Sequence, residues 1–318
     1  MKKAIFLFSF VFLCLSSLGI AQEYLEEVQA CHYLEQGKID EALLLLNRKI
    51  KRYPYNYDCH LYVGLAYYLK GDFEKSLDIL QKVEFETEKL EKAKGTMAAG
   101  KKLESFGQED VFLAEGGGVV FSKEIKGILK FALGMLYRKN KNYENARKRF
   151  SDALKYNYPE IEARKQLCMT YSYLKDYKKA QSELERILEK TQRDDSLIFM
   201  EGFLSYGLKD EALALECFSK VSSSLVAAKH NLALVYYNKG DHQKALSVWE
   251  EISAQFPDDV DSLKNSGRAY FHLGQKEKAQ EQFDKMGLKI KVEKYSPKKI
   301  PLMLEDFFVD VVFDFQCK

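Results

Sequence analysis

Apolar and small side chains recur along this chain at helical spacing, in pairs of short segments separated by a turn. In residues 260–286, the first segment carries Gly267 and Tyr270 and the second carries Ala279. Apolar and small residues three and four positions apart predict amphipathic helices. Gly274 lies between the two segments, and glycine readily adopts the left-handed conformation that ends a helix. The pattern therefore predicts a helix hairpin, whose short helices must pack on neighbours to be stable.

This hairpin pattern occurs seven times, so the chain is predicted to be a stack of repeats. A small residue marks the second segment of each repeat, mostly at intervals of 34 residues: Ala42, Ser76, Ala146, Ala180, Ala214, Ala245 and Ala279. The interval after Ala214 is 31 residues, which predicts a shortened second helix or turn near residues 222–224. A fixed period of this length is typical of a solenoid, in which each unit packs only on its neighbours.

The repeat resembles the tetratricopeptide repeat family. Signature positions are occupied in the unit that begins at Val260 by Gly267, Tyr270, Gly274, Ala279 and Phe283, and in the unit that begins at Val226 by Leu232, Ala233, Tyr236, Gly240, Ala245 and Trp249. The resemblance extends over most of residues 23–286. It implies an all-α, right-handed α-solenoid of about seven helix hairpins, in which the first helix of each hairpin lines a concave groove.

The resemblance also implies which residues face this groove and bind a protein or peptide partner. They are Leu61, Leu65, Tyr68, Phe131, Met135, Lys165, Met169, Phe199, Phe203, Tyr206, Leu234, Tyr237, Lys264 and Arg268. Contiguous exposed apolar surface usually marks a partner site. The alternative is that many of these side chains fill gaps between first helices as core residues. The family's lysine and asparagine clamp for a C-terminal carboxylate is only partly present, with Asn231, Lys264, Asn265 and Arg268 at one end and Phe131 in the place of a clamp lysine.

Two segments depart from the period. Residues 91–126 carry two short apolar runs on either side of three glycines, which suits a small β-hairpin, an ordered loop or a degenerate eighth repeat. Residues 287–318 are interrupted by Pro297 and Pro301, and acidic residues then recur at every fourth position. This spacing favours a helix that caps the last hairpin, although the composition also has high β preference.

The first 21 residues predict a signal peptide. Lys2 and Lys3 precede an uncharged apolar run over residues 4–20, and the small residues Gly19 and Ala21 predict cleavage before Gln22. Two alternatives are an uncleaved membrane anchor and lipid attachment at Cys14. The predicted organisation is therefore a signal peptide at 1–21, two repeats at 22–90, an insertion or degenerate repeat at 91–126, five repeats at 127–286 and a capping segment at 287–318.

The net charge and the motif content of the sequence argue against nucleic-acid binding and against enzymatic activity. Removal of residues 1–21 takes two lysines from 49 basic and 47 acidic residues, and a neutral mature chain has no electrostatic reason to bind nucleic acid. The five mature cysteines are an odd number without a CxxC pair, so we expect them to be apolar packing residues, with a single bridge left open. The chain contains no zinc-binding, nucleophile-elbow or phosphate-loop motif. The sequence therefore predicts no enzyme, catalytic residue, cofactor or metal.

The sequence as a whole predicts a non-enzymatic scaffold that binds a peptide, helix or protein surface in a concave groove. Resemblance to exported bacterial repeat proteins implies a periplasmic or cell-envelope location and a role in envelope assembly or secretion. One alternative is a membrane-anchored subunit of an envelope complex, associated with the membrane through its N-terminal segment. Another is a small-ligand binder or enzyme that uses residues 107–122. The partner and the oligomeric state are left open.

Overall fold

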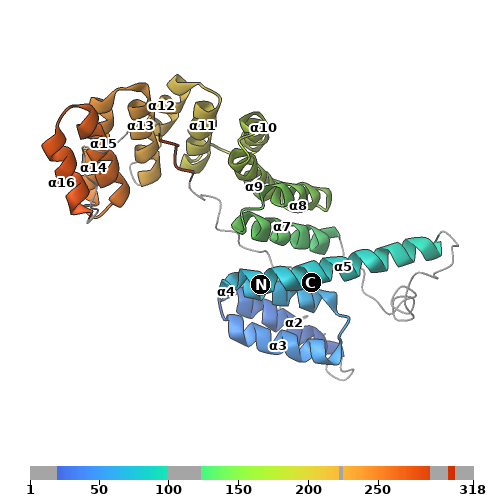
Figure 1. The fold of residues 1–318 in the computed structure, drawn as a ribbon. Helices are drawn as coiled ribbons and strands as arrows, with labels where there is room; N and C mark the ends of the chain where they lie inside the picture. The colour runs from blue at the N-terminus through green and yellow to red at the C-terminus, as the bar shows by residue number, and fades with distance from the viewer. Residues whose placement is uncertain (1–19, 99–122, 222–224, 287–299, 305–318) are drawn as a thin grey trace, which may run out of the picture. The chain divides into compact units, whose positions relative to one another are not determined.

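The structure is a computed structural model that describes residues 20–98, 123–221, 225–286 and 300–304. Regular structure in these ranges consists of helices in successive hairpins (Figure 1). The helices are α2 (Ile20–Glu35), α3 (Ile39–Arg52), α4 (Tyr57–Lys70), α5 (Phe73–Ala98), α7 (Lys123–Lys139), α8 (Tyr143–Lys155), α9 (Glu160–Tyr173), α10 (Tyr177–Leu188), α11 (Asp195–Gly207), α12 (Glu211–Lys220), α13 (Val226–Lys239), α14 (His242–Gln255), α15 (Val260–His272) and α16 (Lys276–Lys285). The predicted all-α hairpin fold is confirmed.

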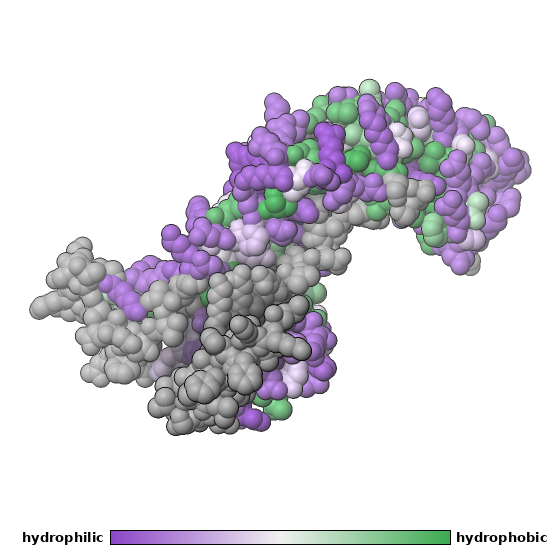
Figure 2. Space-filling model, turned by 180° about the vertical axis from the view of Figure 1, so that it is seen from behind, coloured by the Kyte–Doolittle hydropathy of each residue, from purple (hydrophilic) through white to green (hydrophobic). Residues whose placement is uncertain are grey.

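The chain divides into two compact units between Ala163 and Arg164, within α9. In the first unit, the hairpins α2/α3, α4/α5 and α7/α8 follow one another. The second unit contains α10 to α16, and residues 300–304 also belong to it. Outward-facing side chains of the described residues are mainly hydrophilic, with smaller hydrophobic patches between them (Figure 2). This pattern is what amphipathic helices produce when their apolar faces pack together.

Small residues set the close crossing of the two helices in a hairpin. A Cβ atom added at Gly134 would lie 2.6 Å from Cε1 of Phe150, and the equivalent distance from Gly267 to Phe283 is also 2.6 Å. At the second hairpin, the Ser76 hydroxyl donates a hydrogen bond of 2.7 Å to the carbonyl oxygen of Gly64. The first-helix glycines are therefore explained by helices that approach too closely for larger side chains, and the marker residues on the second helices are all fully buried.

Helix ends follow from local side-chain chemistry. Asp210 and Asp241 precede second helices, and each accepts a hydrogen bond from the backbone N–H three residues later. Such N-caps satisfy donors that a helix start leaves unpaired. Gly71 and Gly240 end first helices with φ of 85° and 90°, a conformation that glycine adopts without steric cost.

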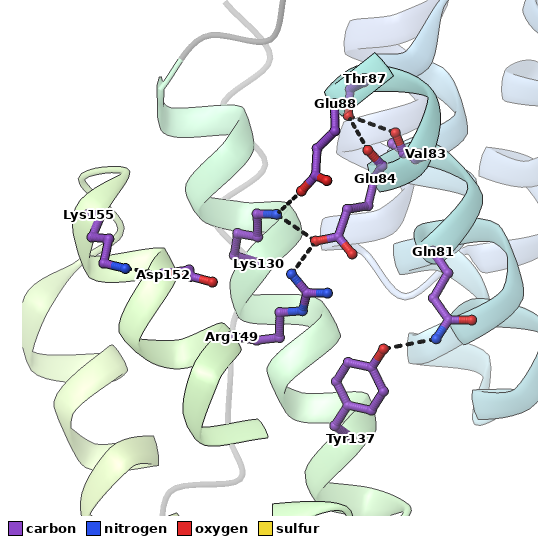
Figure 3. Close-up of polar contacts among 10 residues, drawn as sticks. All are labelled: Gln81, Val83, Glu84, Thr87, Glu88, Lys130, Tyr137, Arg149, Asp152 and Lys155. Carbon is purple, nitrogen blue, oxygen red and sulfur yellow. Dashed lines mark hydrogen bonds and ion pairs between the residues drawn. The ribbon is translucent and has the colours of Figure 1, made fainter. Parts of the chain in front are cut away.

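Buried charges connect the second and third hairpins of the first unit (Figure 3). The Glu84 carboxylate on α5 lies 2.5 Å from Nζ of Lys130 on α7 and 2.6 Å from a guanidinium nitrogen of Arg149 on α8. Glu88 lies 2.9 Å from the same ammonium group. Burial alone would lower the pKa of Lys130, but hydrogen bonds to Glu84 and Glu88 outweigh it and raise the pKa. The charges therefore stabilise one another at this helix junction.

The departures from the repeat period are only partly described. Helix α5 continues to Ala98, and α7 begins at Lys123, so these helices take up both ends of the segment 91–126, and residues 99–122 lie outside the described residues. Helix α12 has 10 residues, fewer than the 14 of α14 but the same number as α16, and residues 222–224 lie outside the described residues, so the shortening near them stays a prediction. The predicted capping helix falls mainly on residues that are not described, but residues 300–304 are not helical.

Cysteine and N-terminal predictions have mixed outcomes. Cys59, Cys168 and Cys217 are free and buried, as expected for packing residues. Cys31 is disulfide-bonded to a cysteine outside the described residues, which is the single bridge that the sequence left open, and it is buried as well. The predicted signal peptide falls on residues that are not described up to position 19, and α2 begins at Ile20. Cleavage before Gln22 would therefore remove the first two residues of α2.

Candidate peptide-binding site

Residues 300–304, with the sequence Ile-Pro-Leu-Met-Leu, bind along α13 (Figure 1). The Asn231 side-chain amide donates to the carbonyl oxygen of Met303 and accepts from its backbone N–H, both at 2.8 Å. Asn238 donates to the carbonyl oxygen of Ile300 at 2.8 Å and accepts from its N–H at 3.1 Å. Asn238 also donates to the Tyr206 hydroxyl at 2.9 Å. We call the surface formed by Tyr206, Asn231 and Asn238 the asparagine site.

The spacing of the two asparagines matches an extended peptide. Asn231 and Asn238 are seven residues apart on one helix, which corresponds to about 10.5 Å along the helix axis. Ile300 and Met303 are three residues apart, and three extended residues span about 10 Å. Pro301 supports this geometry, because proline fixes its own φ and biases the preceding residue towards extended conformations. Each asparagine therefore hydrogen-bonds the backbone N–H and C=O of one residue, and these two residues have the separation expected in an extended chain.

Apolar contacts accompany these backbone hydrogen bonds. Ile300, Leu302 and Met303 pack against a buried cluster that includes Leu234 and Trp249. Leu302 also packs against the neighbouring cluster that includes residues of α11 and α12. The asparagine site therefore combines recognition of the backbone with contacts to apolar side chains, a combination that is typical of peptide-binding surfaces.

Burial explains why the asparagines need partners. Asn231 has no exposed surface, and Asn238 is half-buried. A polar side chain that is removed from water without hydrogen bonds destabilises the fold. Each amide uses both its donor and its acceptor towards the peptide backbone. The amides of Asn231 and Asn238 are thus oriented to bind the free backbone groups of a peptide that has no regular secondary structure.

A cavity of about 600 Å³ continues from the Met303 end of the segment. Its lining includes His230 and the carboxylates that precede and begin α15: Asp258, Asp259 and Asp261. His230 Nε2 lies 3.1 Å from the Asp259 carboxylate. Burial lowers the pKa of His230, although the neighbouring aspartates oppose this shift. The imidazole is therefore neutral near pH 7, and the aspartates give this end of the site a negative charge.

The residues predicted to line a groove divide into two groups. Eight are buried, namely Leu61, Leu65, Phe131, Met135, Met169, Phe199, Leu234 and Tyr237. Phe131, for example, stacks on Tyr158 with ring centroids 4.0 Å apart. These eight are buried between helices, and two of them, Leu234 and Tyr237, also belong to the cluster against which Ile300, Leu302 and Met303 pack. The other six are half-buried, namely Tyr68, Lys165, Phe203, Tyr206, Lys264 and Arg268. Their contact with a partner stays a prediction.

The set predicted from sequence did not include Asn238. Asn231 was considered only as part of a carboxylate clamp, but it binds the Met303 backbone. A usable signal was present, since two asparagines seven residues apart occupy one face of an otherwise largely apolar helix. Asparagine is a poor former of helix interiors, so its presence there at this spacing indicates a role outside the helix.

Across residues 20–98, 123–221, 225–286 and 300–304, no group of three or more histidine, cysteine or acidic side chains is placed to hold a metal ion. Within the same ranges, no helix has the length and apolar character required to cross a membrane.

Comparison with known proteins identifies the repeat. A tetratricopeptide repeat model matches residues 28–89 and 230–286, and a second matches residues 129–158. The fold is similar to the crystal structure of a tetratricopeptide repeat protein from Parabacteroides merdae ATCC 43184, with a TM-score of 0.58 and 15% identity over 84% of this chain and 93% of that one. The crystal structure of the APC/C hetero-tetramer Cut9–Hcn1 gives a TM-score of 0.52 and 15% identity over 84% and 47%.

At these identities, the solved structures show the fold alone. No curated protein has a significant sequence match to this chain. The family models cover hairpins in both compact units, and glycines of first helices, such as Gly134 and Gly267, lie at close helix crossings. The chain contains tetratricopeptide repeats, at residues 28–89, 129–158 and 230–286.

Proposed function

We propose that this protein is an interaction scaffold whose second unit binds an extended peptide of a partner protein at the asparagine site. Tetratricopeptide domains bind proteins and peptides and are generally non-catalytic. A stack of packed hairpins also presents a surface that is shaped before the partner arrives, so binding orders few additional groups.

One observation carries this proposal: two asparagine amides on α13 each form a paired hydrogen bond with the backbone of a non-helical segment. Every peptide offers the same backbone groups, so the asparagines set the conformation and direction of the bound chain. Sequence preference would come from the apolar contacts beside them, since these depend on side-chain shape.

Site-specific photo-crosslinking in the native cell tests the proposal. A photoreactive amino acid at Phe203, which is half-buried on α11, would react with a bound partner, whereas one at Gln243, exposed on α14, is the matched control. We expect a crosslinked partner at Phe203 that is lost when Asn231→Ala and Asn238→Ala are combined. Equal crosslinking at both positions, or crosslinking that is indifferent to the asparagines, would refute this site.

We also propose that the protein is exported and acts in the cell envelope. Support comes from the charged start and apolar run of residues 1–21 and from the disulfide at Cys31, because disulfides persist mainly in oxidising compartments. Fractionation combined with mass spectrometry of the N-terminus provides the test. A mature chain that begins at Gln22 in the soluble envelope fraction is expected. An intact N-terminus in the membrane fraction would favour the anchored form, and a reduced cytoplasmic protein would overturn export.

A further inference from the structure

We propose that residues 300–304 are an intramolecular ligand of the asparagine site, and that a partner peptide binds by displacing them. This inference rests on the proposed function, since it assumes that a partner uses the same site. The segment already occupies both asparagines: the partners Asn238 and Ile300 are 62 residues apart in sequence, and Asn231 and Met303 are 72 apart. These are tertiary contacts of the kind that a separate peptide chain could make.

Because residues 300–304 belong to the same chain as the asparagine site, they are always close enough to occupy it. Residues 286–299 connect the end of α16 to Ile300, a tether of 14 residues. A short tether gives an effective concentration in the millimolar range. A segment of modest intrinsic affinity therefore fills the site for most of the time, and a partner must compete with this local concentration.

Burial of the segment is incomplete, which permits displacement. Pro301 is exposed, and the other four residues of the segment are only half-buried. By contrast, the surface beneath them includes fully buried side chains such as Leu234 and Trp249. Release of the segment would expose apolar contacts at its edge while the helices keep their own packing. The segment is thus placed to leave without unfolding the unit.

The contacts also define the chemistry of a competing partner. It must be an extended segment with free backbone N–H and C=O groups at the two positions that correspond to Ile300 and Met303. Apolar side chains are required at these positions and at the position of Leu302, which packs against both clusters. The position of Pro301 faces solvent, so it tolerates other side chains. A helix would not fit, because its backbone groups are already paired.

A labelled peptide with the sequence of residues 298–306 tests the inference by fluorescence anisotropy. In the full chain, Leu302→Asp removes the central apolar contact and frees the site, so we expect this variant to bind the probe at least tenfold more tightly than the wild type. Adding Asn231→Ala and Asn238→Ala to this variant should abolish binding. Asn47→Ala, which changes an exposed asparagine on α3, is the matched control and should leave binding unchanged.

A second variant and a second measurement guard against misfolding. Replacing residues 300–304 by Gly-Ser-Gly-Ser-Gly should bind the probe as Leu302→Asp does, with helix content by circular dichroism equal to the wild type. In the wild type, an excess of probe should accelerate hydrogen exchange of the Ile300 and Met303 amides.

The outcomes separate the two proposals. Equal affinity of the probe for the wild type and for both segment variants would overturn occupancy by the chain itself, yet leave the asparagine site as a partner site. Absence of probe binding to folded segment variants, with asparagine-dependent crosslinking at Phe203 retained, would show that residues 300–304 are not a ligand of the site. Loss of both signals would overturn the proposed function as well.

Discussion

Glu84 provides a sharp test of how the first unit is held together. Its side chain is 10% exposed and forms ion pairs with both Lys130 and Arg149 (Figure 3). Glu84→Gln keeps the shape and one acceptor but removes the charge. Two cationic groups, with side chains 9% and 19% exposed, would then lack their shared carboxylate.

The magnitude follows from burial. Removing one member of a buried ion pair typically destabilises a protein by about 3 to 5 kcal/mol, because it leaves an uncompensated charge. Glu88 still lies 2.9 Å from Lys130, but its side chain is 51% exposed, so it compensates only in part. We therefore expect a loss near the lower limit, about 3 kcal/mol. Asp152→Asn is the matched control, since its partner Lys155 is 71% exposed, and it should cost less than about 1 kcal/mol.

Hydrogen exchange is the appropriate assay, because a solenoid can open unit by unit and a single unfolding midpoint would average over units. Opening free energies from amides of α5 and α7 should fall in Glu84→Gln and stay constant in Asp152→Asn. Amides of α13, in the second unit, report on global effects and should not change. If both variants lose the same small amount, the ion pairs at this junction contribute no more than surface pairs, and the reasoning from burial is wrong.

Three further predictions concern packing and charge. Phe131→Asp should unfold the first unit, because Phe131 has no exposed surface. Phe203→Asp changes a half-buried position, so this variant should keep the helix content of the wild type. Equal melting temperatures of the two variants by circular dichroism would contradict this contrast. Gly134→Ala should destabilise by about 1 to 3 kcal/mol in urea denaturation despite the higher helix propensity of alanine, because the new Cβ would lie 2.6 Å from Phe150; a gain in stability would show that the hairpin can open. Burial, followed by a neighbouring carboxylate, raises the pKa of Asp58 from 3.8 to about 6, so the folded state binds more protons than the unfolded state between these values. The stability from this group is present below pH 3.8 and is lost as the pH rises through 6. Asp58→Asn should therefore stabilise the protein by about 3 kcal/mol at pH 7 and much less at pH 4. A pH-independent difference in stability would refute the assignment.

The helices and their pairing could be predicted from the sequence, because both depend on local spacing. Apolar residues at helical intervals, glycines at the turns and a small residue on each second helix are all visible within one repeat of 34 residues. Gly134 and Gly267 illustrate the point, since these small residues lie where the two helices of a hairpin cross closely.

The exposure of individual side chains and the formation of the asparagine site depend on the tertiary structure. Phe131 and Phe203 belong to the same predicted set, yet one is buried and the other is half-buried, because each depends on neighbours that the repeat pattern does not specify. The contact between Asn238 and Ile300 joins residues 62 positions apart, beyond the range of any periodicity. Short-range spacing thus determined which helices form, and long-range packing determined which side chains remain available to bind a peptide.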